Sequence, residues 1–427
     1  MSTEILLIDS LLCFLFAFLN IISKRKRFAL LPSTLFALSW GVSSLGCYLY
    51  TTSIFEDSIS ISLYYKNSTA LTEIGYYQFY ILLTIFIAFI CARKKSGTYN
   101  VYRNDFTILS CEIGSTSSML KYALYLYFII GLIRLSIVLT AVGFNYSAMR
   151  DLHITSRSSF SSFDVQLIRV GSYLMQISVL YIGLAGMKSA IDGISIRRTL
   201  ILLLLFCPFQ MSFGGRLFVL SFFLPFVLSY YIVFAMNGMK YIHSSDKHKL
   251  RFIIFASVFL VIVLQILKQG EVISLDSLAD FSTQIFYNSS SYIYMGEFWN
   301  YVPDNYDLQF GRNLITGTCP LISQMMNFWI DTHNSASVCI PSMIPGMYLD
   351  FGFWGSLPVY FIIFYNVEKI AINKISHITF NNMLIYLMLC IFCFNTAGSS
   401  LFDCLKSLFI NMILIYIIKK SVKTRCP

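Results

Sequence analysis

Long apolar runs recur from one end of this chain to the other, and they constrain its fold more than any other feature. A helix of roughly 17 to 25 apolar residues spans about 30 Å of hydrocarbon. About eleven such runs, some of them short, lie near residues 5–22, 29–51, 75–92, 119–143, 166–187, 199–212, 217–236, 252–267, 343–365, 379–396 and 403–418. We therefore expect an all-α, polytopic integral membrane protein with about eleven transmembrane helices.

The charged residues predict how these helices are oriented. Only 12% of the 427 residues are charged and 57% are hydrophobic, which excludes an ordinary soluble domain. If the crossings alternate, the basic clusters share one side, which the positive-inside rule assigns to the cytoplasm. These clusters lie at 24–27, 93–95, 197–198, 247–251, 369–374 and 419–425. The N-terminus is then outside and the C-terminus cytoplasmic, and the net charge of +10 reflects topology rather than nucleic-acid binding.

One long polar segment interrupts the apolar pattern. We expect a single transmembrane helical domain, 1–427, with a large periplasmic loop at 268–342 between the helices near 252–267 and 343–365. This loop is longer than a connector needs, so it is predicted to have structure of its own.

The cysteines do not indicate a metal or cofactor site. Cys390 and Cys393 form a CxxC, but they lie in an apolar helix without further ligands, which favours packing. Cys319 and Cys339 lie in the outer loop, and the sequence leaves open whether they form a disulfide. No metal and no cofactor is predicted.

Arginines crowd the outer half of the helix pair at 119–143 and 166–187. They are Arg134, Arg150, Arg157 and Arg169. Arg134 lies about 20 Å from the cytoplasmic end of its helix, and an arginine at that depth must face protein, water or an anion. Ion pairs with Asp151 or Asp164 explain one or two of the four more readily than all of them.

A break is predicted inside the apolar stretch 199–236, because two full crossings need about 40 residues. Gly214 and Gly215 predict two shortened helices that meet below the outer surface. Irregular backbone at such depth is tolerated where protein buries it or water lines it. Arg216 is then expected to face an outward cavity beside a helix N-terminus that attracts anions. The alternative is a tight hairpin with Arg216 snorkelling to the surface.

The motif at 344–355, Ile-Pro-Gly-Met-Tyr-Leu-Asp-Phe-Gly-Phe-Trp-Gly, lies where the polar loop meets an apolar run. We expect a helix to start at Pro345, with Gly352 and Gly355 allowing close helix packing. Asp350 is costly in a membrane unless it faces a cavity or a partner, so it indicates a functional site.

Four arginines and two titratable side chains are expected to form one outward-facing cavity. They are Arg134, Arg169, Arg216 and Arg312, with His333 and Asp350 near the mouth. Clustered guanidinium groups bind phosphate through charge-assisted, often bidentate hydrogen bonds. A lipid-linked phosphate or pyrophosphate entering from the bilayer would fit. The chain has no Walker loop, HExxH, GxSxG or zinc-ligand spacing, so nucleotide hydrolysis and metalloprotease chemistry have no support.

The topology, the long outer loop and two motifs together resemble the Wzy-type O-antigen polymerases of bacterial inner membranes. The motifs are Phe-Gly-Gly-Arg at 213–216 and Pro-Gly-x-Tyr-x-Asp-Phe-Gly-x-x-Gly at 345–355. The resemblance implies transfer of a glycan chain from undecaprenyl pyrophosphate to a second lipid-linked repeat unit in the periplasm, without nucleotide or metal. It also implies a chain-length regulator and a flippase as partners, besides the lipid bilayer and the undecaprenyl-pyrophosphate-linked oligosaccharide.

This reaction suggests a role for each candidate residue. We expect Arg216 and Arg312 to bind the pyrophosphate and stabilise its charge. Either His333 or Asp350 takes the proton from the acceptor hydroxyl. The expected substrate-binding residues are Arg134, Arg150, Arg157 and Arg169.

Four other classes stay open. An O-antigen ligase also has a large outer loop with Arg and His, and this sequence separates it poorly from a polymerase. A flippase needs polar residues through the full depth of the membrane, whereas here they cluster in the outer half. A membrane O-acyltransferase is expected to show an early His and Arg pair, and the first two apolar runs contain no histidine. A non-enzymatic scaffold leaves the buried arginines unexplained.

Overall fold

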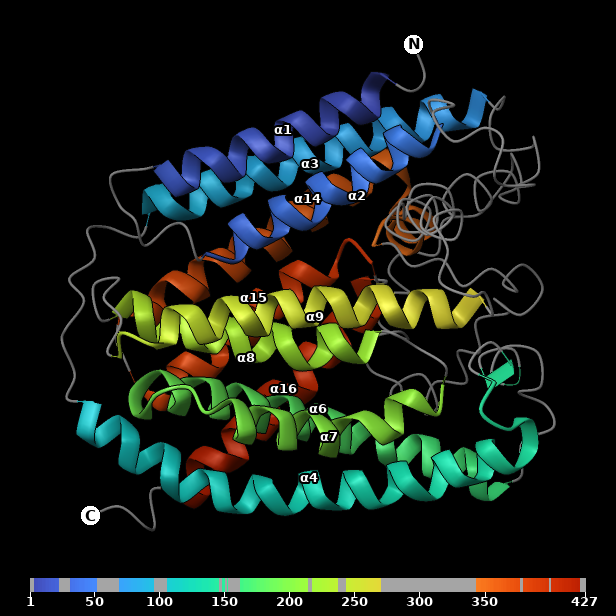
Figure 1. Cartoon of the computed structure of the whole chain (residues 1–427). Coiled ribbons are helices and arrows are strands. Elements are labelled where there is room, and N and C mark those ends of the chain that lie inside the picture. The colour runs from blue at the N-terminus through green and yellow to red at the C-terminus, as the bar shows by residue number, and fades with distance from the viewer. Residues whose placement is uncertain are drawn as a thin grey trace. The chain divides into compact units, whose positions relative to one another are not determined.

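The computed structural model of the chain describes residues 4–22, 31–51, 69–95, 106–145, 148–149, 152, 162–213, 217–236, 243–269, 343–376, 379–398 and 401–422. Their regular structure is helical, and no strand occurs among them (Figure 1). The helices are α1 (Glu4–Ile22), α2 (Pro32–Thr51), α3 (Thr69–Lys95), α4 (Phe106–Val142), α6 (Ser162–Asp192), α7 (Ile196–Met211), α8 (Leu217–Met236), α9 (Asp246–Gln269), α14 (Ile344–Ser376), α15 (Phe380–Asn395) and α16 (Leu401–Val422). Each predicted apolar run falls on one of these helices, so the all-α prediction is confirmed.

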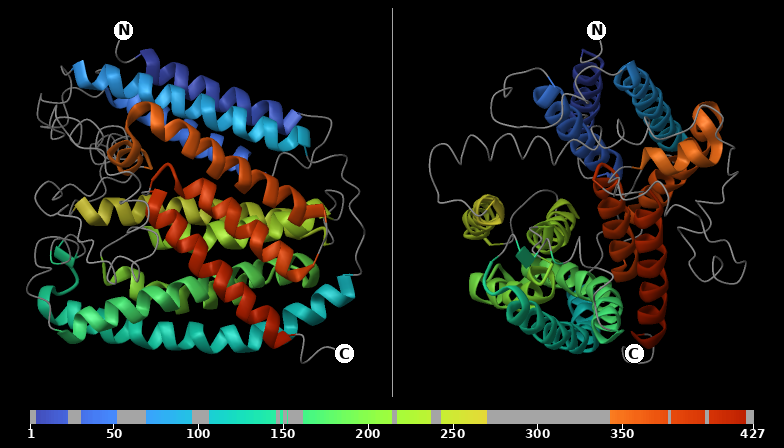
Figure 2. Two further views of the ribbon diagram at one scale, coloured as in Figure 1. Left: turned by 180° about the vertical axis from the view of Figure 1, so that it is seen from behind. Right: turned by 90° about the vertical axis from the view of Figure 1, so that its right-hand side faces the viewer.

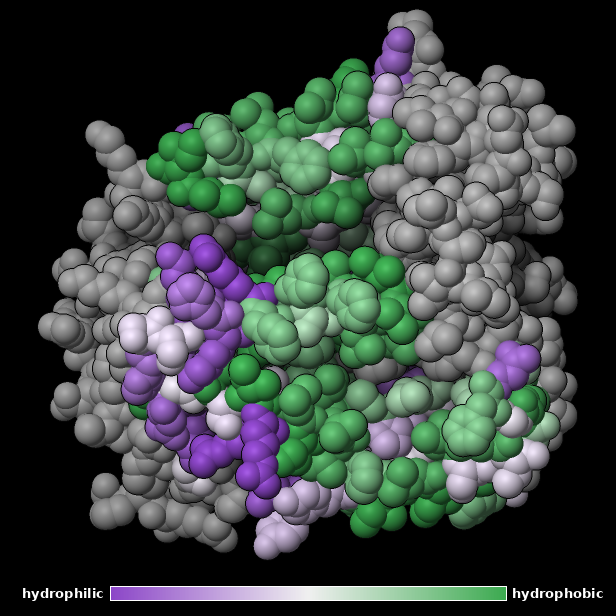
Figure 3. Space-filling model, in the orientation of Figure 1, coloured by the Kyte–Doolittle hydropathy of each residue, from purple (hydrophilic) through white to green (hydrophobic). Residues whose placement is uncertain are grey.

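Four segments in the described part of the chain are long and apolar enough to cross a membrane. They are Glu4–Ile22, Gly75–Lys94, Leu120–Val142 and Ser162–Asp192. Hydrophobic side chains also cover much of the face drawn in Figure 3. On α9, Phe252, Phe255 and Phe259 are exposed at helical spacing, and such a stripe suits contact with lipid. These features support a membrane protein.

The chain divides into two compact units. The first takes Met1–Asn100, Ser282–Ser376 and Met388–Phe409, and the second takes Val101–Phe281, His377–Leu387 and Ile410–Pro427. Helices α1, α2, α3 and α14 thus belong to the first unit, and α4, α6, α7, α8 and α9 to the second. From residue 270 on, the predicted periplasmic loop at 268–342 lies outside the described residues.

An aromatic core joins α1, α2, α3 and α14, which lie side by side in the first unit (Figure 2). The ring of Phe36 on α2 packs edge-on against Phe86 of α3 and Phe364 of α14, with centroids 6.2 and 5.0 Å away. Phe86 in turn stacks on Phe16 of α1 at 4.3 Å. Offset and edge-on pairs of this kind add stability beyond the area that they bury.

A polar network joins the same four helices at one end, with one residue from each. Arg93 of α3 donates from Nε to Glu368 Oε1 at 2.9 Å and from Nη1 to Asn20 Oδ1 at 2.6 Å. Ser33 of α2 accepts from Arg93 and donates to Glu368 Oε1 at 2.7 Å. Since α1 and α3 end here and α2 begins here, α2 runs antiparallel to both.

The motif at 344–355 forms an elbow rather than a straight helix start. Gly352 has φ 66° and ψ −171°, a backbone conformation that is essentially restricted to glycine. The Tyr360 hydroxyl donates to the Met343 carbonyl oxygen at 3.0 Å, although a straight helix would separate these residues by about 25 Å. The chain therefore turns sharply at Gly352, so the segment before it runs at an angle to the longer part of α14 (Figure 2). The prediction that Gly352 serves close helix packing was wrong, because this glycine breaks the helix.

Phe209 is the centre of packing between α4, α6 and α7 in the second unit. A Cβ atom added to Gly131 of α4 would lie 2.6 Å from the backbone nitrogen of Phe209. A Cβ atom added to Gly171 of α6 would overlap the Phe209 ring. Two glycines from neighbouring helices thus make room for one aromatic side chain of α7.

The buried carboxylate of Asp246, at the start of α9, holds the short connection between α6 and α7. Its Oδ1 accepts from the Ile194 backbone N–H at 3.1 Å, and its Oδ2 accepts from the Tyr230 hydroxyl at 3.0 Å. Ser195 then caps α7 by accepting from the backbone N–H of Arg198 at 3.4 Å. This fixes where α7 begins relative to the end of α6.

Candidate functional site

Among the predicted site residues of the second unit, Arg134 has the best-defined contacts. It lies on α4 and is only 2% exposed. Its Nη1 donates to Ser212 Oγ at 2.7 Å, and its guanidinium lies over the Phe213 ring, 3.5 Å from the centroid. Because α7 ends at Met211 with Ser212 as its C-cap, this cation lies at the negative end of the α7 dipole.

The second terminal nitrogen of Arg134, Nη2, is buried without a hydrogen-bond partner among the described residues. Buried N–H groups are nearly always satisfied, and a charged one left unpaired is costly. The Asp164 carboxylate, in the first turn of α6, interacts favourably with the guanidinium. Arg134 therefore keeps one donor available for an anion oxygen at the end of α7.

The helix break falls where the sequence predicts it. Helix α7 ends at Met211 and α8 begins at Leu217. With 16 residues, α7 is about 24 Å long, which is less than the hydrocarbon thickness. Gly214, Gly215 and Arg216 lie outside the described residues, but Phe213, which directly precedes them, contacts Arg134.

The other predicted arginines differ in environment or lie outside the described residues. Arg169 is on α6 and is exposed, unlike Arg134. The candidates outside the described residues are Arg150, Arg157, Arg216, Arg312 and His333. A cavity shared by all of these side chains stays a prediction.

Asp350 is fully buried in the first part of α14, just before the elbow at Gly352. The segment that carries it packs on α3, where the rings of Tyr348 and Tyr77 meet at 5.4 Å. Tyr77 also hydrogen-bonds Ser356 Oγ at 2.6 Å, on the far side of the elbow. Asp350 is therefore held in place by backbone geometry and by contacts on both sides of Gly352.

No protein-family model, curated protein sequence or solved structure matches this chain. Within the described ranges, no group of three or more His, Cys, Asp and Glu side chains is placed to hold a metal ion. The chemistry of the site therefore rests on its own residues, of which a buried guanidinium with an unused donor is the clearest.

Sequence reasoning missed another buried carboxylate, that of Asp9 of α1. Gln78 of α3 donates from Nε2 to Asp9 Oδ2 at 2.9 Å and to Ser44 Oγ of α2 at 3.0 Å. The other carboxylate oxygen, Oδ1, has no hydrogen-bond partner in the described part of the chain. The signal was present, since an acidic residue inside an apolar run needs a partner at the same depth.

Proposed function

We propose that this chain is an O-antigen polymerase that transfers a glycan chain from undecaprenyl pyrophosphate to a lipid-linked repeat unit, at the periplasmic face of a bacterial inner membrane. The resemblance at 213–216 and 345–355 suggests the family. The observation that carries the proposal is Arg134, a buried guanidinium with an unused donor, next to the first of these motifs. Such a group is suited to bind a phosphate oxygen.

In the proposed reaction, the acceptor hydroxyl oxygen attacks the anomeric carbon of the donor sugar. The bond from that carbon to the pyrophosphate oxygen breaks, and its electron pair leaves with undecaprenyl pyrophosphate. The hydroxyl proton passes to His333 or Asp350. Arg216 and Arg312 stabilise the charge on the leaving pyrophosphate. The residues assigned to holding the substrate are Arg134, Arg150, Arg157 and Arg169.

We further propose that all eleven helices cross the membrane, with the N-terminus outside and the C-terminus in the cytoplasm. Helix α2 supports a count above four, because it follows the candidate span α1 over most of its length. Ser10 of α1 donates to the Gly41 carbonyl oxygen at 3.0 Å, and Asn20 donates to Thr34 Oγ1 at 3.1 Å. These two contacts lie at different depths along α1, so α2 runs alongside α1 and crosses the same hydrocarbon layer.

A lipopolysaccharide gel of a strain lacking this gene, beside its complemented parent, tests the proposal. A polymerase defect leaves a single repeat unit on the lipid core and removes the ladder. Loss of every repeat unit would instead identify a ligase or a flippase. An unchanged ladder would refute a role in O-antigen assembly.

Arginine variants test the assigned chemistry in the same assay. Arg216→Ala should abolish the ladder, because removing one donor to a developing charge costs a factor of about 10² to 10³ in rate. Arg197→Ala removes an exposed charge outside the proposed site and should leave the ladder intact. Normal polymer from a stably inserted Arg216→Ala variant would contradict the assignment.

A further inference from the structure

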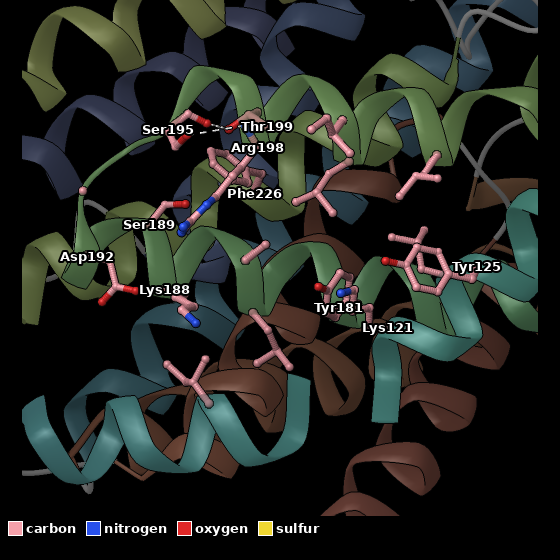
Figure 4. Close-up of a pocket in the computed structure, with 18 residues that line it drawn as sticks. Lys121, Tyr125, Tyr181, Lys188, Ser189, Asp192, Ser195, Arg198, Thr199 and Phe226 are labelled. Atoms are coloured by element: carbon pink, nitrogen blue, oxygen red, sulfur yellow. Dashed lines mark hydrogen bonds between the residues drawn. The ribbon is translucent and has the colours of Figure 1, made fainter. Parts of the chain in front are cut away.

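A cavity of about 460 Å³ lies between α4, α6 and α7 in the second unit (Figure 4). Each helix contributes one cation to its lining: Lys121 from α4, Lys188 from α6 and Arg198 from α7. Asp192 is the one carboxylate in the lining, so the net charge of the lining is positive. All three cations are exposed, and none forms an ion pair within the described residues.

Apolar side chains line the cavity deeper along the same helices. They include Leu124 of α4, Leu184 of α6 and Leu205 of α7. In Figure 4, Lys188 and Arg198 lie toward one end of the cavity, whereas Lys121 lies beside Tyr181, two turns of α6 before Lys188. Lys188 lies near the end of the span Ser162–Asp192 and Arg198 lies in the first turn of α7, which is the level of lipid headgroups.

The cations belong to a shaped site rather than to a diffuse charged surface. In Figure 4 the Arg198 side chain extends from α7 toward Ser189 on α6. Lys121 lies near Tyr125, with its Nζ 5.4 Å from the ring centroid. The first turn of α7, capped by Ser195, also directs backbone N–H groups and the positive end of its dipole toward this region.

We propose that this cavity binds an anionic membrane phospholipid, with its phosphate against Lys188 and Arg198 and the start of an acyl chain against the leucines. Basic pockets between transmembrane helices are suited to such headgroups. A soluble phosphate would use the cations but not the apolar lining. The site lies about 20 Å along α4 from Arg134, so it is separate from the proposed reaction and independent of it.

Native mass spectrometry of the purified full chain in uncharged detergent tests this site, with phosphatidylglycerol as the probe. Each of Lys188→Gln and Arg198→Gln should weaken phosphatidylglycerol binding about five-fold, the effect of one cation at a lipid surface. Arg197→Gln makes the same change on the neighbouring residue, which does not line the cavity, and should alter binding by less than about two-fold. Lys188→Arg keeps the charge and should retain binding.

The same measurement distinguishes the other sources of affinity. Phosphatidylcholine, which carries no net charge, should bind the wild-type chain more weakly and should not discriminate between the variants. Equal losses for Arg197→Gln and Arg198→Gln would reduce the effect to general surface charge and overturn the proposal. Displacement of phosphatidylglycerol by excess inorganic phosphate would identify a soluble-anion site and overturn it as well. A thermal unfolding transition at the wild-type temperature confirms that each variant is folded.

Discussion

Arg93 links four helices through one guanidinium group, because its partners Asn20, Ser33 and Glu368 come from the other three. The sequence predicts Arg93 only as part of the basic cluster at 93–95. The positive-inside rule says on which side a cation lies, but it does not say which residue it contacts. The carboxylate of Glu368 is hundreds of residues away in the chain and fully buried, so only the fold brings the two together.

At this scale we expect Arg93→Gln to destabilise the chain by about 3 kcal/mol, since it leaves the carboxylate of Glu368 buried without its counter-ion. Lys94→Gln makes the same change at an exposed neighbour and should have an effect below about 0.5 kcal/mol. Denaturant titration of both purified variants in detergent micelles measures the difference. Equal stabilities would mean that the network does not hold these helices together.

At the scale of elements, glycines decide how closely the helices approach, and the sequence predicts the wrong ones. Gly352 was expected to pack against a helix and instead forms an elbow that positions Asp350. Gly131 and Gly171 were not singled out, although both accommodate Phe209. A glycine in an apolar run has the same sequence pattern in either role. Its role depends on a partner that lies far away in the chain.

Gly131→Ala should therefore destabilise the second unit by about 2 kcal/mol, because the added methyl group meets backbone that cannot move aside easily. The matched control is Gly114→Ala on the same helix, where a Cβ atom meets nothing within 4 Å. This substitution should be neutral or stabilising by up to about 1 kcal/mol. Thermal unfolding in detergent compares the two variants. A larger loss for Gly114→Ala would contradict the packing around Phe209.

For the whole molecule, hydropathy alone predicts where the helices lie, because each crossing needs an apolar run of a certain length. The sequence also predicts the break between α7 and α8, because the stretch 199–236 contains two glycines and is too short for two full crossings. It does not predict the burial of Asp9, the Asp246 contacts or the cavity between α4, α6 and α7. These depend on which faces of separate helices meet, and a single sequence leaves that pairing open.

A topology with eleven crossings and one with four predict opposite activities for alkaline phosphatase fused at the same sites. With the N-terminus outside and every helix crossing, alkaline phosphatase fused after Lys95 or Asp192 should be inactive, and active after Val142 or Gln269. The reason is that this enzyme requires disulfides, which form outside the cytoplasm. If only the four candidate spans cross, the chain after Lys95 and Asp192 lies outside and the chain after Val142 lies inside. Activity after Lys95 and Asp192 would thus refute the eleven-helix topology and, with it, the periplasmic location of Arg216 and of the loop at 268–342.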